Sequence, residues 1–569
     1  LESGLVGRYR REQEHPVSRA LVRDYEEVCR WVPRHPAITL ATAFALVLST
    51  IPVYRQLGSE FMPPLDEGTL LYMPTAMPGL SVTEAQRVLN AQNRILRSFP
   101  EVETVFGKAG RVESPTDPAP LSMIETTIAL RPRSEWRRKE RWYADLPGPL
   151  QVPLRHFWPD RISLDELRDE MDAHLRVAGV PNIWTMPIQN RIDMLATGVR
   201  TPIGVKIIGP DLAGMQSIGE RLEALLARVP GTRSVVAERA AGGYYLDFEL
   251  DRDALARHGL AVADANEAIE AAIGGVTVTT TIDGRRRQDV RVRYARDFRD
   301  SVQRLRQVLV PVAGGGQVPL GELAEIRRTQ GPSMIRDENG QLASYVYVDL
   351  AGRDAGGWVD EAKELVAREL ALPPGYALTW SGRYESMQRV RERMRVLAPL
   401  TLLLIALLLY ANTKSAVKVG IVLLAVPFSL VGAVWLLWAL GYHMSVAVWV
   451  GMIALMGLDA ETGVFMLLFL DLAYERRKAA GRLRTRDDLV EAVIEGAVGR
   501  VRPKMMTVAA AFAGLLPLMW STGSGADAMK RVAAPMVGGL VTSFLLELLV
   551  YPVLYALWKR RSLGRAPVA

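Results

Sequence analysis

Apolar stretches long enough to cross a lipid bilayer occur at uneven intervals in this chain, and their spacing constrains the fold more than any other feature. A membrane-spanning helix needs about 20 mostly apolar residues. One such stretch lies near the start at 37–54, and the next begins only at residue 396. A hydrophilic block at 56–393 separates them. We predict six transmembrane helices, one plus five, at 37–54, 396–412, 417–440, 444–470, 505–520 and 531–557.

Composition narrows the class of protein further. With 49% hydrophobic and 23% charged residues, the chain is too apolar for an ordinary soluble protein and too charged for one confined to the membrane. Its single cysteine, Cys29, excludes an intrachain disulfide and a cysteine-based metal site. No two of its six histidines are four residues apart, which argues against a histidine-rich zinc site. The start shows no signal peptide, and we interpret the chain as a piece of something longer.

Lysine and arginine cluster in alternate loops between the predicted spans, and this pattern sets the orientation. The clusters precede the first span and follow the second, fourth and sixth, as in TKSAVK, YERRKAAGRLRTR and WKRRSLGR. All of them fall on one side, which the positive-inside rule identifies as the cytoplasm. The hydrophilic block then lies outside. The net charge of +7 therefore reflects membrane topology, and we predict no nucleic-acid partner.

The hydrophilic block alternates strand-like and helix-like patterns, which predicts an α+β fold. The strand-like GTLLYMPTAM precedes an amphipathic helix that Ser81 and Glu84 open as a capping box, and two strands follow. A second cycle runs from PIGVKIIG through the helix at 212–229 to the strand-like SVVAER and YYLDFEL. Both helices pass through proline into a strand, so we predict a duplicated βαβ unit. The Gly- and Thr-rich GGVTVTTTIDGRRRQ predicts an exposed arm.

Five stretches are similar to those of the resistance-nodulation-division (RND) efflux pumps, in particular the heavy-metal branch and most closely its copper and silver pumps. They are EFMPPLDEGTLLYMP, VFGKAGRVESPTDPAP, NRIDMLATGVRTPIGVK, GLDAETGVFML and GRVRPKMMTVAAAFAGLLP. The match runs nearly end to end and resembles the C-terminal half of such a pump. This resemblance implies half of an RND fold, with ferredoxin-like subdomains in a periplasmic block. We expect the N-terminal half to lie outside this chain.

The resemblance also implies a domain plan and partners. Pumps of this family are homotrimers in the Gram-negative bacterial inner membrane, joined by a periplasmic adaptor and an outer-membrane channel. The expected domains are a cytoplasmic linker with an amphipathic helix at 1–36, the first transmembrane helix at 37–55, pore subdomain 1 at 56–195, pore subdomain 2 at 196–239 and 335–393, a docking subdomain at 240–334, five transmembrane helices at 394–560 and a cytoplasmic tail at 561–569.

Three methionines hold the transported ion in the family, and the matching positions here are Met73, Met123 and Met194. Methionine usually fills irregular gaps in a core, so any one of them alone would be interpreted as packing. The match of all three at once favours a metal site. Neutral thioether sulfurs suit Cu(I), and Ag(I), another soft monovalent ion, should behave alike. We therefore expect Cu(I) or Ag(I) as the transported ion and no permanently bound cofactor.

Other positions on the expected route of the ion match the methionines of the family only in part. Met529 matches a relay position of the family, although an interfacial packing role is equally consistent. Leu260 and Thr277 stand where the family can have further methionines, which leaves the stepwise relay in doubt. Carboxylates beside the site methionines could attract a cation, but we favour strand-edge and turn roles for them: Asp117, Glu125 and Asp193.

Ionisable residues inside a span are costly and point to function. Glu461, in the fourth span, and Lys504, next to the fifth, match the acidic and basic members of the proton relay of the family. The principal aspartate of that relay belongs to the other half. Asp459 and Glu547 are also placed within predicted spans, and their roles stay open.

The resemblance implies proton-driven efflux of Cu(I) or Ag(I), which is a secondary transport activity and not an enzymatic one. No nucleophile–base pair, P-loop or dinucleotide fingerprint points to an enzyme. Two alternatives stay open. A pump for divalent zinc, cobalt or nickel would need carboxylates or histidines at the three methionine positions. A non-transporting membrane scaffold that binds metal or a partner would need no relay.

Overall fold

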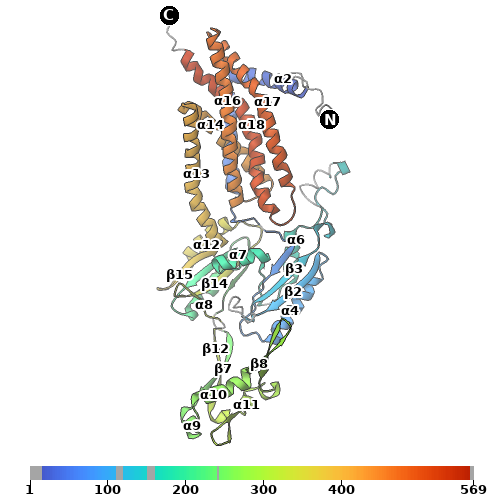
Figure 1. The fold of residues 1–569 in the computed structure, drawn as a ribbon, viewed down its shortest axis with the longest axis vertical. Helices are drawn as coiled ribbons and strands as arrows, with labels where there is room; N and C mark the ends of the chain where they lie inside the picture. The colour runs from blue at the N-terminus through green and yellow to red at the C-terminus, as the bar shows by residue number, and fades with distance from the viewer. Residues whose placement is uncertain are drawn as a thin grey trace.

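The computed structural model describes residues 16–563 except 64, 111–119, 150, 152–159, 178, 240–241 and 333. The molecule is elongated (Figure 1): long helices form a bundle at one end, two sheets with their helices form the middle, and a smaller module forms the far end. The first long helix, α3 (Pro36–Gln56), packs against helices near the end of the chain. The hydrophilic block is therefore an insertion into one helical bundle.

Five helical segments among the described residues are long and apolar enough to cross a membrane. They are α3, α13 (Arg383–Thr413), the consecutive α14 (Ala416–Leu423) and α15 (Ala425–Ala439), α16 (Val446–Ala479), and α18 (Ala526–Leu563). The fifth predicted span, 505–520, falls in the second half of α17 (Arg486–Met519), which packs against α16 and α18. The first half of α17 is rich in charged residues, so its apolar part is short. Length and composition thus support five of the six predicted spans, and the span at 505–520 stays a prediction.

Two glycines allow α15 and α18 to approach closely. A Cβ atom at Gly432 would lie 2.0 Å from the carbonyl oxygen of Gly538, and one at Gly538 would lie 2.3 Å from the carbonyl oxygen of Gly432. Small residues at such crossings let the backbones of membrane helices touch. This contact fixes α18 against α15 near the polar residues in the interior of the bundle.

A short amphipathic helix, α2 (Pro16–Trp31), lies at the end of the bundle that is far from the sheets (Figure 1). Its buried Tyr25 donates a hydrogen bond to the carbonyl oxygen of Leu548, at 2.8 Å. Cys29 packs into the same core. The helix predicted within 1–36 is therefore present and is attached to the bundle.

The first sheet is antiparallel, with the strand order β2-β3-β1-β4. Burial alternates along β3, so every second side chain faces the core. Ser81 caps the first helix by accepting a hydrogen bond from the Glu84 backbone NH, at 3.2 Å. The elements are β1 (Thr69–Tyr72), α4 (Val82–Arg97), β2 (Val102–Ala109), β3 (Ile124–Leu130), α6 (Leu164–His174) and β4 (Trp184–Thr185).

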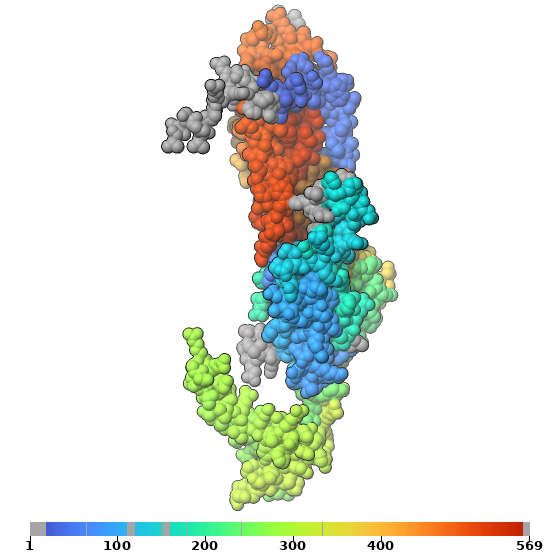
Figure 2. Space-filling view, turned by 90° about the vertical axis from the view of Figure 1, so that its right-hand side faces the viewer, coloured from blue at the N-terminus to red at the C-terminus, as the bar shows by residue number. Residues whose placement is uncertain are grey.

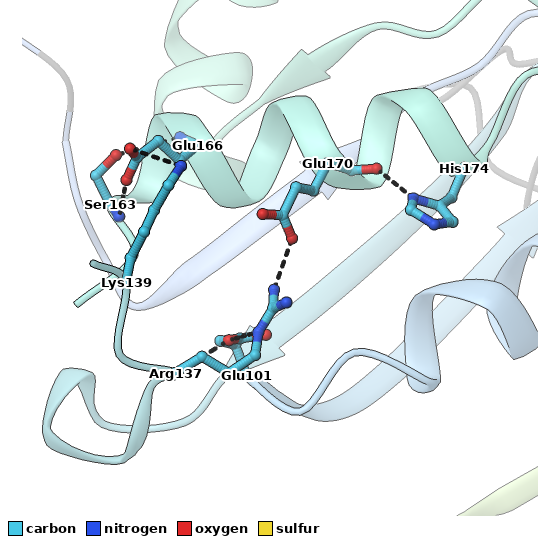
Figure 3. Close-up of polar contacts among 7 residues, drawn as sticks. All are labelled: Glu101, Arg137, Lys139, Ser163, Glu166, Glu170 and His174. Carbon is cyan, nitrogen blue, oxygen red and sulfur yellow. Dashed lines mark hydrogen bonds and ion pairs between the residues drawn. The ribbon is translucent and has the colours of Figure 1, made fainter. Parts of the chain in front are cut away.

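Ion pairs attach α6 to the loop that precedes it (Figure 3). Lys139 lies 3.0 Å from Glu166, which also belongs to the capping box at the start of α6. Arg137 reaches Glu170, one turn further along the helix, at 2.7 Å. The guanidinium of Arg141 binds Glu166 as well and holds the pKa of Glu166 well below its usual range.

The second sheet repeats the strand order of the first. It runs β6-β14-β5-β15, with the short β13 (Asp337–Glu338) paired to β14. Numbered within each unit, both sheets have the order 2-3-1-4 and the element order β-α-β-β-α-β. The elements are β5 (Ile203–Ile208), α8 (Leu212–Leu226), β6 (Thr232–Ala237), β14 (Gln341–Leu350), α12 (Ala355–Glu369) and β15 (Ala377–Gly382).

A two-stranded ribbon, β7 (Gly243–Leu250) with β12 (Ala324–Gly331), leads from the second sheet into the far module. The prediction that YYLDFEL belongs to the second cycle is therefore wrong, because its pairing partner follows the module. The arm β8 (Val276–Asp283) with β9 (Arg286–Val292) is exposed throughout and stands clear in Figure 2, as predicted. The module also contains α9 (Arg252–Arg257), α10 (Val262–Ile269), α11 (Val302–Leu305), β10 (Leu309–Pro311) and β11 (Gln317–Pro319).

Candidate functional site

The three methionines that match the metal ligands lie in one side-chain cluster where the two sheets meet. Met73 directly follows β1, Met123 precedes β3, and Met194 lies on α7 (Pro187–Thr197). Met73 is 0% exposed and Met123 is 9% exposed, whereas the half-buried Met194 packs against the cluster. Tyr345 and Tyr347 of β14 complete it from the second sheet. Residues that are far apart in sequence thus converge at one place.

Backbone hydrogen bonds hold two of these methionines in position. The Met73 NH donates to the carbonyl oxygen of Ile183, at 2.9 Å. Met123 pairs with Thr75 in an antiparallel bridge. Side chains on such paired segments keep their direction, because strand pairing fixes the register.

Met194 is positioned by a helix with clear start and stop signals. Pro187 occupies the first position of α7, and Gly198 ends the helix with a left-handed φ of 74°. One turn before Met194, the Asn190 amide nitrogen lies 3.3 Å from the Met194 sulfur and donates to it. This hydrogen bond orients the Met194 thioether and leaves its second lone pair for another partner.

A cavity of about 470 Å³ adjoins the cluster, and Met123 and Met194 contribute to its lining. The Arg200 guanidinium stacks 4.4 Å from the centre of the Tyr347 ring on its wall. The Tyr347 hydroxyl donates to Glu238, at 2.7 Å. The charged groups of this wall are thus engaged with one another, and the methionine sulfurs provide the soft donors.

Two further methionines line the cavity and are absent from the predicted ligand set. Met77 is 56% exposed, so it does not serve core packing. The spacing LLYMPTAMP places it four residues after Met73 and could have identified it. Met334 comes from the segment between β12 and β13, and nothing in its sequence surroundings distinguishes it.

The carboxylates near the site methionines are held by cations. Asp193 accepts a hydrogen bond from Arg383, at 2.7 Å, and burial raises the pKa of Asp193 more than Arg383 lowers it. Glu125 pairs with Lys108 at 3.0 Å. Asp117 lies outside the described residues. Within the described parts of the chain, no three His, Cys, Asp or Glu side chains form a group that could hold a metal ion.

The proposed relay positions belong to other parts of the fold. Met529 lies in the first turns of α18 and is 48% exposed. Leu260 packs against the core of the far module, and Thr277 is exposed on the arm. None of these residues belongs to the methionine cluster, and Met529 stays a prediction.

Lys504 forms a buried ion pair in the interior of the bundle, but with Glu547. Their side chains are 1% and 0% exposed. Glu461, the other residue that matches the relay, is exposed, and its cationic neighbour is Arg500. Residues two apart on a helix differ by about 200° in direction, so α16 turns Asp459 inward and Glu461 outward. Within this chain, Lys504 therefore pairs with Glu547, and the relay role of Glu461 stays a prediction.

Comparison with known proteins found a family whose pattern covers most of this chain. The model of the AcrB/AcrD/AcrF family matches residues 5–559. The chain belongs to this family. It is 39% identical over 558 residues to a putative cation efflux system protein, SilA, of Salmonella typhimurium, covering 98% of this chain and 51% of SilA. The cation efflux system protein CusA of Escherichia coli (strain K12) is 39% identical over 553 residues, covering 97% of this chain and 51% of CusA.

More distant relatives are named for other metals. The cobalt-zinc-cadmium resistance protein CzcA of Cupriavidus metallidurans is 30% identical, covering 98% of this chain and 50% of CzcA. A crystal structure of a heavy metal efflux pump (crystal form II) superposes with a TM-score of 0.82 at 28% identity, covering 96% of this chain and 52% of the pump. The resemblance to heavy-metal efflux pumps is thus confirmed. The chain spans about half the length of the curated relatives that it matches.

Proposed function

We propose that this chain is the C-terminal half of a proton-driven exporter of Cu(I) and Ag(I). The observation that supports this most strongly is the convergence of Met73, Met123 and Met194 in one cluster beside a cavity. Thioether sulfur is a soft, neutral donor that suits monovalent soft ions. A thioether needs no deprotonation, so binding at such a site depends little on pH.

In this proposal, each part of the fold has a role in the pump. The bundle supplies six spans if α17 crosses the membrane as the fourth of the five C-terminal spans. The two β-α-β-β-α-β units form ferredoxin-like pore subdomains, and the module at 240–334 forms a docking subdomain with an exposed arm. The assembled pump is a homotrimer in the Gram-negative inner membrane, with a periplasmic adaptor, an outer-membrane channel and the N-terminal half as partners.

Protons supply the driving force through Glu461 and Lys504 in this proposal. Lys504 has its carboxylate partner within this half, whereas Glu461 faces outward from the bundle. An outward carboxylate in a membrane helix is costly unless another segment covers it. The N-terminal half would provide that cover.

A divalent-metal pump is the nearest alternative, because CzcA is a relative. Zinc and cobalt prefer imidazole, carboxylate or thiolate ligands. Asp193 and Glu125, the described carboxylates next to the site methionines in sequence, are held by Arg383 and Lys108. Glu238 on the cavity wall pairs with Arg336. A scaffold that only binds metal is the second alternative, and it predicts binding without transport.

Cu(I) titration of the purified chain under a competing chelator tests the proposal. We expect one ion per chain, with binding lost in Met194→Ile. Met77→Ile is the matched control, because Met77 lines the same cavity without belonging to the cluster. Equal binding in the wild type and Met194→Ile would contradict the thioether site. Metal binding without metal-dependent proton movement in the complete pump would favour the scaffold.

A further inference from the structure

Two carboxylates and one ammonium group are buried together between α16, α17 and α18. Glu547 pairs with Lys504 and also accepts a hydrogen bond from the Ser543 hydroxyl, at 2.8 Å. The Thr462 hydroxyl of α16 lies 3.5 Å from the same carboxylate, but its shorter hydrogen bond, at 3.1 Å, goes to the carbonyl oxygen of Asp459. Glu547 therefore has a cation and the Ser543 hydroxyl as partners, which favours the ionised carboxylate.

Asp459 is buried as well, but it lacks such partners. It is 1% exposed, and neither of its carboxylate oxygens has a hydrogen-bond partner among the described residues. The hydroxyls of Ser429 and Ser543 are its neighbours, but they donate to the carbonyl oxygen of Val426, at 2.9 Å, and to Glu547. Asp459 is therefore a buried carboxylate whose hydroxyl neighbours donate to other acceptors, whereas Glu547 has both a cation and a hydroxyl donor.

The charged and titratable groups that face Asp459 come from two elements. Lys504 on α17 and Glu547 and Tyr551 on α18 interact with it electrostatically, and Arg500 lies one turn before Lys504. The Tyr551 hydroxyl donates to the carbonyl oxygen of Val422, at 3.0 Å, so it offers Asp459 no proton. Among the described residues, Lys504 is thus the one cation that interacts with both Asp459 and Glu547.

Charge balance then decides where a proton resides. One ammonium and two ionised carboxylates would leave a net negative charge in the interior of a membrane bundle. An unpaired ionised carboxylate there is so costly that it takes up a proton instead. Glu547 has the cation and the donors, so the proton belongs on Asp459.

We propose that Asp459 is a proton-binding site of this half, with Lys504 and Glu547 as its internal counter-charge. When Asp459 is neutral, Lys504 pairs with Glu547. When the O–H bond of Asp459 breaks and the proton leaves to water, the new carboxylate competes with Glu547 for Lys504. Because the two carboxylates lie on α16 and α18, this exchange shifts the packing of three helices. The inference rests on the proposed function and adds a residue beyond Glu461.

Infrared spectroscopy of the full chain in lipid bilayers tests the site directly. The C=O stretch of a protonated carboxylic acid is separate from that of a carboxylate, and carbon-13 labelling of aspartate or glutamate tells the two residue types apart. We expect one protonated aspartic acid at neutral pH, which is lost as the pH is raised and absent in Asp459→Asn. The matched control is Asp471→Asn, which removes an aspartate already paired with Lys418 and should leave the signal unchanged.

A second variant tests the counter-charge. Lys504→Met removes the cation, so we expect a protonated glutamic acid signal from Glu547 in addition. If Asp459→Asn fails to fold, carbon-13 labelling of the wild-type chain still tests the proposal. A C=O stretch of a protonated acid that shifts with labelled glutamate and not with labelled aspartate would overturn it. Absence of any protonated acid at neutral pH would overturn it too. The infrared signal needs no metal. Failure of the metal-binding experiment would therefore not change the infrared result, and the two proposals can fail separately.

Discussion

Replacing Met194 with leucine separates a ligand from a packing residue, because the two side chains have similar volume. A volume-conserving exchange in a core usually costs less than about 1.5 kcal/mol. Met194 is half-buried and packs against the cluster from one side, so we expect Met194→Leu to remain below that limit. Without metal, the variant should therefore unfold almost like the wild type.

Metal changes that comparison. An ion that binds the folded chain alone stabilises it by about 2.7 kcal/mol when its free concentration is 100 times the dissociation constant. We expect wild-type protein to gain about this much from Ag(I), and Met194→Leu to gain much less at the same concentration. Urea unfolding of the full chain in detergent, in chloride-free buffer with and without Ag(I), measures the difference.

Met77→Leu is the control for this experiment, since Met77 lines the same cavity but stands outside the cluster. It should retain the full gain from Ag(I). An equal gain in wild type and Met194→Leu would refute the ligand assignment. A large loss of stability without metal would instead show that Met194 is a packing residue.

Three further predictions follow from contacts elsewhere in the fold. Gly432→Ala should destabilise the α15–α18 contact by about 1–3 kcal/mol through overpacking, whereas Gly420→Ala, with no atom within 4 Å, should not; thermal unfolding compares them. Glu166→Gln should lower the free energy of unfolding above about pH 4.5, the usual pKa of glutamate, because the folded chain lowers the pKa of Glu166. The loss should disappear as the pH falls through that lowered pKa. Lys504→Met should cost about 3–5 kcal/mol by leaving Glu547 unpaired, and Lys504→Met with Glu547→Leu should recover part of it; a denaturant series measures both.

Patterns within one element could be predicted from the sequence. Ser81 caps α4 as its position before Glu84 indicates, because the hydrogen bond is local. The exposed arm also follows from a local pattern of threonines and a glycine turn. The long apolar helices are predicted for the same reason, whereas the span at 505–520 stays a prediction because charged residues fill the first half of α17 and leave a short apolar part.

Contacts between distant elements could not be predicted in this way. The resemblance singled out Glu461 and left the role of Asp459 open, but the rotation of α16 turns Asp459 and not Glu461 into the bundle. The partner of Lys504 is on α18, and no periodicity shows which faces of two helices meet. The contribution of Met334 to the cavity depends likewise on how the second sheet folds back, so its sequence surroundings contain no signal.

X-ray absorption of the Cu(I)-loaded chain tests the central claim most directly, because it reports which atoms surround the metal. The account predicts a first coordination shell of three sulfurs in the wild-type chain, and fewer sulfurs or no bound copper in Met123→Leu, which removes a donor that is 9% exposed. A shell dominated by nitrogen or oxygen, or one unchanged in Met123→Leu, would contradict the assignment of Met73, Met123 and Met194 as the metal site.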